Sequence, residues 1–290
     1  MINNLLNEYK ILIDDYLAEA FADRNFDYRD VLDAMYYSLS AGGKRIRPVL
    51  TLEFGKLCGT PIEALLPIAC AVELIHTYSL IHDDLPCMDD DDMRRGQPSC
   101  HVKFGESTAL LAGDGLLTMA FELITRSKLS DAAKIKAVNI LSTRAGVHGM
   151  IGGQVIDLAH EGRSVSQQQL DTINMLKTSA LIEAACLMGC VETQDENVIN
   201  GAKTYAQKLG LAFQITDDIL DVTGDAALLG KPVGSDADNL KDTYVTLLGI
   251  EACEKIADKL TAEACEAVEK LPGDTEFLTS LARYLCKRNN

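Results

Sequence analysis

Apolar residues dominate the segment from 62 to 85, and its few polar residues mark no single solvent-facing side. This pattern is typical of a helix that is buried on all sides. Thr60 to Glu63 predicts the start of the helix as a capping box, with a proline at the first helical position and Glu63 at the third. Pro67 lies inside the segment, so the helix either starts there or kinks there, and the sequence leaves both possibilities open.

Two further helices have recognisable caps. Ser166 and Gln169 have the spacing of a second capping box, and the helix that follows is predicted to extend to about Met188. Asp195 predicts the start of a third helix, from Glu196 to about Val222, with Gly224 as its stop.

The rest of the chain favours the same class of structure. No proline lies between Pro98 and Pro232, and no alternating apolar pattern is bounded by hairpin signals. No repeat or low-complexity linker divides the chain. We therefore expect an all-α fold of about ten helices, with the middle helices buried, as a single domain over residues 1–290.

Composition and charge exclude several classes of function. The 290 residues are 47% hydrophobic and 24% charged, which provides a large core and argues against intrinsic disorder. A net charge of −16 disfavours binding to nucleic acid or to an anionic membrane. The most apolar long run, Thr108–Ile124, is broken by Asp114 and Glu122, so no stable membrane anchor is expected.

The first residues and the cysteines indicate a cytoplasmic protein. The N-terminal segment has neither a basic start nor a small-residue cleavage site, unlike a secretory signal. The nine cysteines are odd in number and lack zinc-finger spacing, so we expect free buried thiols in a reducing compartment.

Two acidic segments carry the chemistry. In the first, His82 to Gly96, Pro86 interrupts the helix, so Asp83, Asp84 and Asp89 are expected to flank a turn. In the second, Asp217-Asp218-Ile219-Leu220-Asp221, the first and last residues share a helix face. Each segment closes an apolar helix, where two carboxylates about 6 Å apart repel by roughly 3 kcal/mol. Oxygen ligands without His or Cys suit a hard cation, and Mg²⁺ prefers few carboxylates together with substrate phosphates.

Basic residues accompany these acids. Residues 42–48 read GGKRIRP and place three cations at a break in the chain, while Arg94 and Arg95 directly follow the first acidic segment. Lys177, Lys231 and Lys241 lie in the second half. A diphosphate held partly by Arg and Lys and partly through Mg²⁺ fits both signs of charge.

At this point the sequence resembles the trans-isoprenyl diphosphate synthase family, and within it the bacterial type of farnesyl diphosphate synthase. The resemblance is nearly end to end, and the two Asp-rich motifs in this order are highly specific. It rests on GGKRIRP (42–48), ELIHTYSLIHDDLPCMDDDDMRRG (73–96), GGQVIDL (152–158), MLKTSALIEAA (175–185), FQITDDILD (213–221) and LGKPVGSDADNLKDTY (229–244).

The resemblance implies a helical bundle around a deep central cavity, a homodimer, and three Mg²⁺ ions that bind the allylic diphosphate. The implied metal ligands are Asp83, Asp84 and Asp89 on one wall and Asp217 on the other, with Asp218 and Asp221 in support. The implied allylic-side contacts are Arg94, Lys177, Thr178, Gln214, Lys231 and Lys241. The implied contacts to isopentenyl diphosphate are Lys44, Arg47, His76 and Arg95. Arg45 matches the motif without an assigned role, and the closing Lys287-Arg288 is left without one.

The implied reaction is ionisation of the allylic diphosphate, attack on the resulting cation by the double bond of isopentenyl diphosphate, and loss of a proton. Lys177, Thr178, Gln214 and Arg94 are the implied catalytic residues. Tyr78 and Ser79, at the fifth and fourth positions before the first motif, are implied to set product length, and the aromatic favours a fifteen-carbon product. Helix geometry alone places Tyr78 about 140° around from Asp83, so spacing does not establish this role.

Three alternatives remain at this point. A geranylgeranyl diphosphate synthase would perform the same chemistry and stop at twenty carbons. A terpene cyclase would ionise one diphosphate and have no use for the cations at Lys44, Arg47 and Arg95. An inactive, cation-binding subunit is disfavoured because both acidic motifs are complete.

Overall fold

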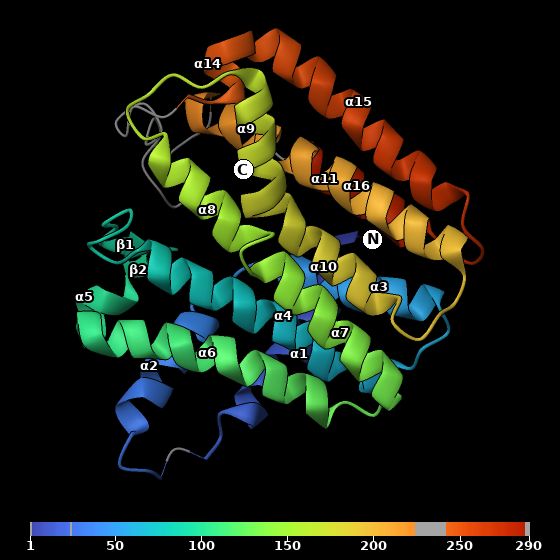
Figure 1. The fold of residues 1–290 in the computed structure, drawn as a ribbon. Helices are drawn as coiled ribbons and strands as arrows, with labels where there is room; N and C mark the ends of the chain where they lie inside the picture. The colour runs from blue at the N-terminus through green and yellow to red at the C-terminus, as the bar shows by residue number, and fades with distance from the viewer. Residues whose placement is uncertain (1, 24, 224–241, 288–290) are drawn as a thin grey trace.

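A computed structural model describes residues 2–23, 25–223 and 242–287, and helices form nearly all of its regular structure (Figure 1). The all-α prediction is confirmed, with more helices than the ten expected because several are short. Their bounds are α1 Ile2–Ala20, α2 Arg29–Ser40, α3 Ile46–Leu57, α4 Ile62–Asp83, α5 Cys100–Phe104, α6 Glu106–Arg126, α7 Asp131–Ala145, α8 Met150–Ala159, α9 Gln167–Asn174, the π-helix η1 Met175–Ser179, α10 Ala180–Gly189, α11 Glu196–Thr223, α14 Tyr244–Leu248, α15 Ile250–Glu269 and α16 Glu276–Cys286.

Helix α4 lies in the middle of the molecule, as its apolar pattern predicts (Figure 1). It packs against α3, α6 and α10, and its buried residues fall on every side. A helix surrounded in this way needs no polar face, which explains why residues 62–85 show no amphipathic period.

The predicted start of α4 is wrong by one residue. Pro61, in an extended conformation, is the N-terminal cap, and its carbonyl accepts the amides of Ala64 and Leu65. Thr60 therefore lies outside the helix, and no side-chain cap forms. Pro67 lies within the helix, so the helix does not start there.

The other two caps are confirmed. The Ser166 hydroxyl accepts the amide of Gln169, and the Gln169 side chain accepts the amide of Ser166. The helix that follows reaches Gly189, but it is interrupted by the wide turns of η1, which the sequence analysis missed. The Asp195 carboxylate accepts the amide of Asn197 at the start of α11.

A small hairpin departs from the purely helical expectation. Strand β1 (Met93–Arg94) pairs antiparallel with β2 (Gln97–Pro98). Arg95 and Gly96 connect them, and both have positive φ, as a two-residue hairpin turn requires. Strands of two residues are too short to produce an alternating pattern.

Two of the described helices, α4 and α6, are long and apolar enough to cross a membrane by length and composition alone. This corrects the sequence argument, because a few charges in such a window do not exclude a span. In the most apolar window of α4, 78% of residues are buried inside the protein, against 39% in α6. A buried core helix meets the same criterion, so the finding is weak evidence for a span.

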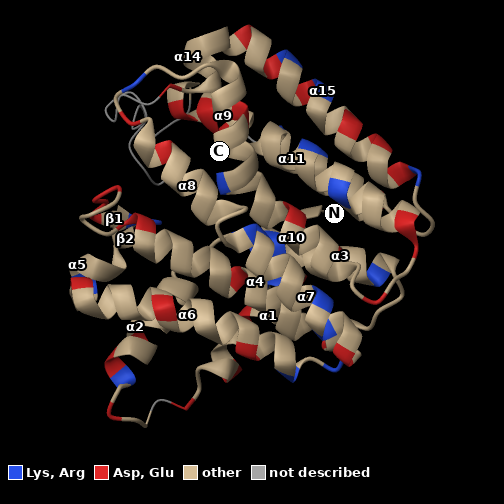
Figure 2. Cartoon of the chain, in the orientation of Figure 1, with Lys and Arg blue, Asp and Glu red and all other residues tan. Residues whose placement is uncertain are grey.

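Charge and cysteines follow the sequence analysis in part. Acidic segments recur along α15 and over many other helices, with basic ones between them (Figure 2). All nine cysteines are free thiols, as expected. Cys87 is exposed, and Cys58 and Cys286 are half-buried, so the prediction that the thiols are buried holds only for the other six.

Candidate active site

A cavity of about 570 Å³ lies among α3, α4, α6, α8, η1 and α10. Its ionisable lining includes Arg47, His76, Asp83 and Lys177. Its apolar lining consists of Leu80, Met88, Leu117, Met150, Ile151, Val155, Leu158 and Leu181. Such a cavity suits a ligand with an ionic group and a hydrocarbon tail.

Asp83 is the last residue of α4, and the chain turns sharply after it. The amide of Asp89 donates to the Asp83 carbonyl at 2.8 Å, so the predicted turn between these residues is present. Burial raises the pKa of Asp83 to about 6, which Lys177 opposes and Asp89 reinforces. A carboxylate in this setting is stabilised by a nearby cation.

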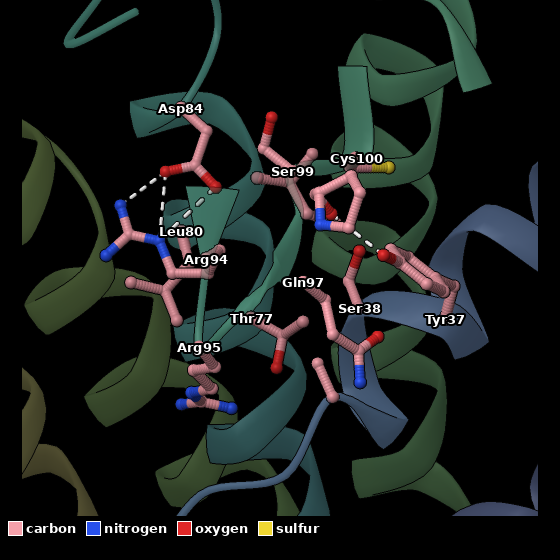
Figure 3. A pocket seen from close by; sticks show the side chains of 13 residues that line it. Tyr37, Ser38, Thr77, Leu80, Asp84, Arg94, Arg95, Gln97, Ser99 and Cys100 are labelled. Carbon is pink, nitrogen blue, oxygen red and sulfur yellow. Dashed lines mark hydrogen bonds and ion pairs between the residues drawn. The ribbon is translucent and has the colours of Figure 1, made fainter. Parts of the chain in front are cut away.

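Asp84 is buried, and its carboxylate forms an ion pair with the guanidinium of Arg94. Figure 3 shows the guanidinium of Arg94 turned toward Asp84, with Nε 3.0 Å from Oδ1 and 3.3 Å from Oδ2. Arg94 also contacts Asp91 at 3.2 Å. Burial raises the pKa of Asp84, and the hydrogen bond from Arg94 opposes that rise. The structure thus pairs a predicted metal ligand with a predicted diphosphate contact.

Arg47 and Arg95 form a cationic cluster around the ring of His76. Arg47 Nε is buried and has no hydrogen-bond partner. Burial lowers the pKa of Arg47 to about 10, opposed by Glu73 and reinforced by Arg95. Burial, followed by the surrounding arginines, holds the pKa of His76 well below its usual value, so the ring is neutral. An anion is the partner that this cluster lacks.

The loop before α3 packs beneath Arg95. The Arg95 guanidinium donates to the carbonyl of Gly42. Gly43 has a φ of 121°, and a Cβ there would lie 2.9 Å from Arg95 Nη1, so only glycine fits. The ammonium of Lys44 lies 5.6 Å from the ring centroid of Tyr284. Gly42 and Gly43, which precede the basic residues of the motif, therefore allow the loop to approach the Arg95 guanidinium closely.

Arg45 has a structural role. Its guanidinium is buried and binds Glu73 and Asp14, each at 2.8 Å, as well as the carbonyl of Leu39. This explains why the motif contains a third cation that need not contact a ligand.

Lys177 and Thr178 lie in η1, whose wide turns present both to the cavity. The Lys177 ammonium is 2.7 Å from Asp157 Oδ2, on α8. A Cβ at Gly153, one turn before Asp157, would lie 2.2 Å from the Lys177 nitrogen, so α8 and η1 are in backbone contact. No role was predicted for Gly153 or Asp157, although their spacing of four residues places them on one helix face.

A hydrogen-bonded chain connects η1 to the second acidic segment. The Thr178 hydroxyl donates to Gln214 Oε1 at 3.2 Å, and Gln214 Nε2 donates to Asp218 Oδ1 at 3.0 Å. Asp218 Oδ2 accepts the amide of Tyr244 at 2.9 Å. Both oxygens of Asp218 thus have protein partners, which favours the supporting role expected for it.

The remaining predicted residues of this segment are only partly described. Asp217 is half-buried and Asp221 is buried, four residues apart on α11. Lys231, Lys241 and Arg288 lie outside the described residues. The prediction that the two acidic segments face each other across the cavity stays a prediction.

Tyr78 lines the cavity together with Asp83, despite their angular separation on α4. Its ring packs edge-on against His82, with centroids 5.6 Å apart. Burial raises the pKa of Tyr78 to about 12, and its hydroxyl has no partner. The neighbouring Ser79 hydroxyl donates to the His76 carbonyl at 2.9 Å.

The donor set fits magnesium better than an all-protein metal cage. Within residues 2–23, 25–223 and 242–287, no three carboxylate, imidazole or thiol groups gather into a metal-binding cluster. Burial raises the pKa of Asp83, and the charge of Asp89 adds to that rise, so the two carboxylates interact across the turn. Mg²⁺ binds through one or two carboxylates and completes its shell with water and phosphate.

Comparisons with known proteins agree with this site. Residues 29–278 match the polyprenyl synthetase family. The chain is 44% identical to the farnesyl diphosphate synthase of Escherichia coli (strain K12), over 94% of each chain. It is 43% identical to the geranylgeranyl diphosphate synthase of Cyanophora paradoxa, over 98% of this chain and 96% of the relative.

A solved structure is also similar. The geranyltransferase of Helicobacter pylori, complexed with magnesium and isoprenyl diphosphate, matches with a TM-score of 0.83 and 32% identity, over 97% of this chain and 95% of that one. With the family match over most of the chain and relatives above 40% identity along nearly all of it, this protein belongs to the polyprenyl synthetase family.

Proposed function

We propose that this protein is a farnesyl diphosphate synthase. It condenses isopentenyl diphosphate with dimethylallyl or geranyl diphosphate, and it releases inorganic diphosphate. The assignment follows from the family, and farnesyl diphosphate synthases are among its similar relatives.

The observation that carries this function is the composition of the cavity lining. Asp83 and Lys177 supply one ionic region of the lining, and Arg47 with His76 supplies another. Arg95 lies outside the lining but close enough for its charge to lower the pKa of Arg47. Two diphosphates need two such regions, whereas a terpene cyclase needs one. The apolar lining between α6 and α8 accommodates a prenyl chain and keeps water from a reactive cation.

We assign the allylic diphosphate to the first region and isopentenyl diphosphate to the second. Asp83, Asp84, Asp89 and Asp217 would hold three Mg²⁺ ions, with Asp218 and Asp221 in support. Lys231 and Lys241 are proposed allylic contacts on sequence grounds alone. Bound Mg²⁺ supplies Lewis-acid neutralisation of the departing diphosphate.

The chain's own residues act on charge and geometry. Lys177 and Arg94 hold the allylic diphosphate while its C–O bond breaks, and the bonding electron pair leaves with the diphosphate. Arg47 and Arg95 hold isopentenyl diphosphate so that its double bond faces the allylic carbon and forms the new C–C bond. Thr178 and Gln214 border the cation, and the released diphosphate accepts the proton that is lost.

A C15 product is favoured by Tyr78, whose buried ring occupies the cavity wall one helical turn from His82. The alternative is a C20 product, since a geranylgeranyl diphosphate synthase is about equally similar in sequence. We further propose a cytoplasmic homodimer without a stable membrane anchor, built from a single polyprenyl synthase domain over residues 1–290.

One assay tests the function. Purified protein is incubated with Mg²⁺, labelled isopentenyl diphosphate and each allylic primer in turn, and the products are sized by chromatography. We expect a C15 product and loss of turnover on chelation of the metal. A C20 product would favour the alternative. Products formed from an allylic diphosphate alone would indicate a cyclase, and no product with any primer would refute the proposal.

A further inference from the structure

Gln154 is the polar member of an apolar stripe on α8. That stripe lines the cavity at positions 150, 151, 154, 155 and 158, a helical spacing, and the other four residues are Met150, Ile151, Val155 and Leu158. An amide in such a stripe costs free energy unless it has hydrogen-bond partners.

Neither atom of the Gln154 amide has a partner. Both Oε1 and Nε2 are buried without a hydrogen bond in the protein. Leaving a buried polar group unsatisfied costs free energy, and a catalytic role or an absent binding partner is one of the reasons for which a protein retains such a group. Because no bond fixes the amide, rotation about the side chain can turn Oε1 to a partner in the cavity.

The position of Gln154 along α8 places it beside the reacting groups. The preceding residue, Gly153, is in backbone contact with Lys177, and Asp157 pairs with the Lys177 ammonium. Gln154 is rotated by about 100° from that face, toward the cavity that Lys177 and Asp83 also line.

The other glutamine of the site is already engaged. Gln214 Oε1 accepts the Thr178 hydroxyl, and its Nε2 donates to Asp218. Its amide is therefore oriented by protein partners, whereas the Gln154 amide is not.

We propose that Gln154 is a further catalytic residue, whose amide oxygen stabilises the electron-deficient allylic carbon as the diphosphate departs. This inference rests on the proposed prenyl transfer. Turned into the cavity, Oε1 brings the negative end of the amide dipole to a charge that exists only after ionisation, so it lowers the barrier without adding to the binding of the neutral prenyl chain. A dipole in a water-excluded cavity acts more strongly than in water.

The test compares Gln154→Met, which keeps an unbranched side chain of similar length, with the control Gln167→Met on the exposed first turn of α9. Two unreactive ligands distinguish an effect of Gln154 on the positive charge from an effect on the fit of the prenyl chain. One is an allylic thiolodiphosphate, which is neutral at the first carbon, and the other is an allylic diphosphate analogue with a protonated amine in place of the cationic carbon. Affinities are measured by calorimetry, turnover with the proposed substrates, and folding by thermal unfolding.

We expect Gln154→Met to lose about 10²-fold in turnover, the scale for removing one preorganised dipole. The affinity of Gln154→Met for the amine analogue should fall by a similar factor, while its affinity for the thiolodiphosphate stays unchanged. Gln167→Met should match the wild type in turnover and in both affinities. Unchanged affinity for the amine analogue, or equal weakening of both analogues, would overturn the role of Gln154. An inactive wild-type enzyme would instead refute the proposed function.

Discussion

Gly153→Ala tests whether the contact between α8 and η1 positions the catalytic residues. The added Cβ would lie 2.2 Å from the Lys177 nitrogen, 2.7 Å from its Cα and 2.8 Å from the carbonyl carbon of Leu176. All three are backbone atoms, so no side-chain rotation relieves the overlap. Reaching an ordinary contact of about 3.5 Å requires the two helices to separate by roughly 1.3 Å.

Two effects on stability oppose each other in this variant. Alanine is a better helix former than glycine by up to about 1 kcal/mol, whereas overpacking costs about 1–3 kcal/mol. The net loss of stability is therefore expected to be small, at about 0–2 kcal/mol. The effect on activity is larger, because a displacement of about 1 Å in a catalytic group can cost roughly 10²-fold in rate. The same displacement lengthens the ion pair between Asp157 and Lys177.

The assay is steady-state turnover together with thermal unfolding, and Gly115→Ala is the matched control. Gly115 is also helical, but its Cβ would meet the sulfur of Met35 at 2.9 Å, the far end of a flexible side chain. We expect Gly115→Ala to keep normal turnover. If Gly153→Ala is folded and turns over at the wild-type rate, the backbone contact does not set the position of Lys177.

Three further predictions concern separate parts of the molecule. Asp217→Ala should lower turnover by orders of magnitude while circular dichroism shows an intact fold, and near-normal turnover would remove the second acidic segment from the mechanism. Tyr78→Met should shift the product toward C20 by chromatography, and an unchanged product length would exclude Tyr78 as the wall that limits the chain. Arg45→Met should lower the free energy of unfolding by about 3–5 kcal/mol, measured with denaturant, because the buried Glu73 loses its partner; a change below 1 kcal/mol would contradict this.

Local patterns in the sequence predicted the elements well. The uniform apolarity of α4 and the box formed by Ser166 and Gln169 are set by neighbours a few residues away, so they can be read from the sequence. The start of α4 was misplaced because Pro61 provides an extended backbone cap that competes with the Thr60 side chain.

Long-range contacts were not predictable in the same way. The pairing of Asp84 with Arg94 depends on the hairpin that folds residues 93–98 back toward α4, and nothing in the spacing shows it. The unsatisfied amide of Gln154 becomes visible only when the neighbours from other helices are in place. Among the residues that the motifs predicted, Arg47, His76, Asp83, Lys177 and Thr178 line the cavity, whereas Arg45 and Asp218 are held by other side chains or by backbone.

The wide turn of η1 determines which residues of α10 face each neighbouring helix, because it rotates α10 about the helix axis. Each π turn accommodates an additional residue, so Ala180–Gly189 is rotated relative to the phase that an uninterrupted α-helix from Gln167 would give. Deleting one residue from 175–179 would turn the downstream half by about 100°. Gly189, where a Cβ would lie 2.5 Å from the Thr51 carbonyl oxygen of α3, would then leave the interface with α3, and a bulkier residue would enter it. The site and the core are therefore coupled through a single irregular turn, and a one-residue deletion there would damage both together.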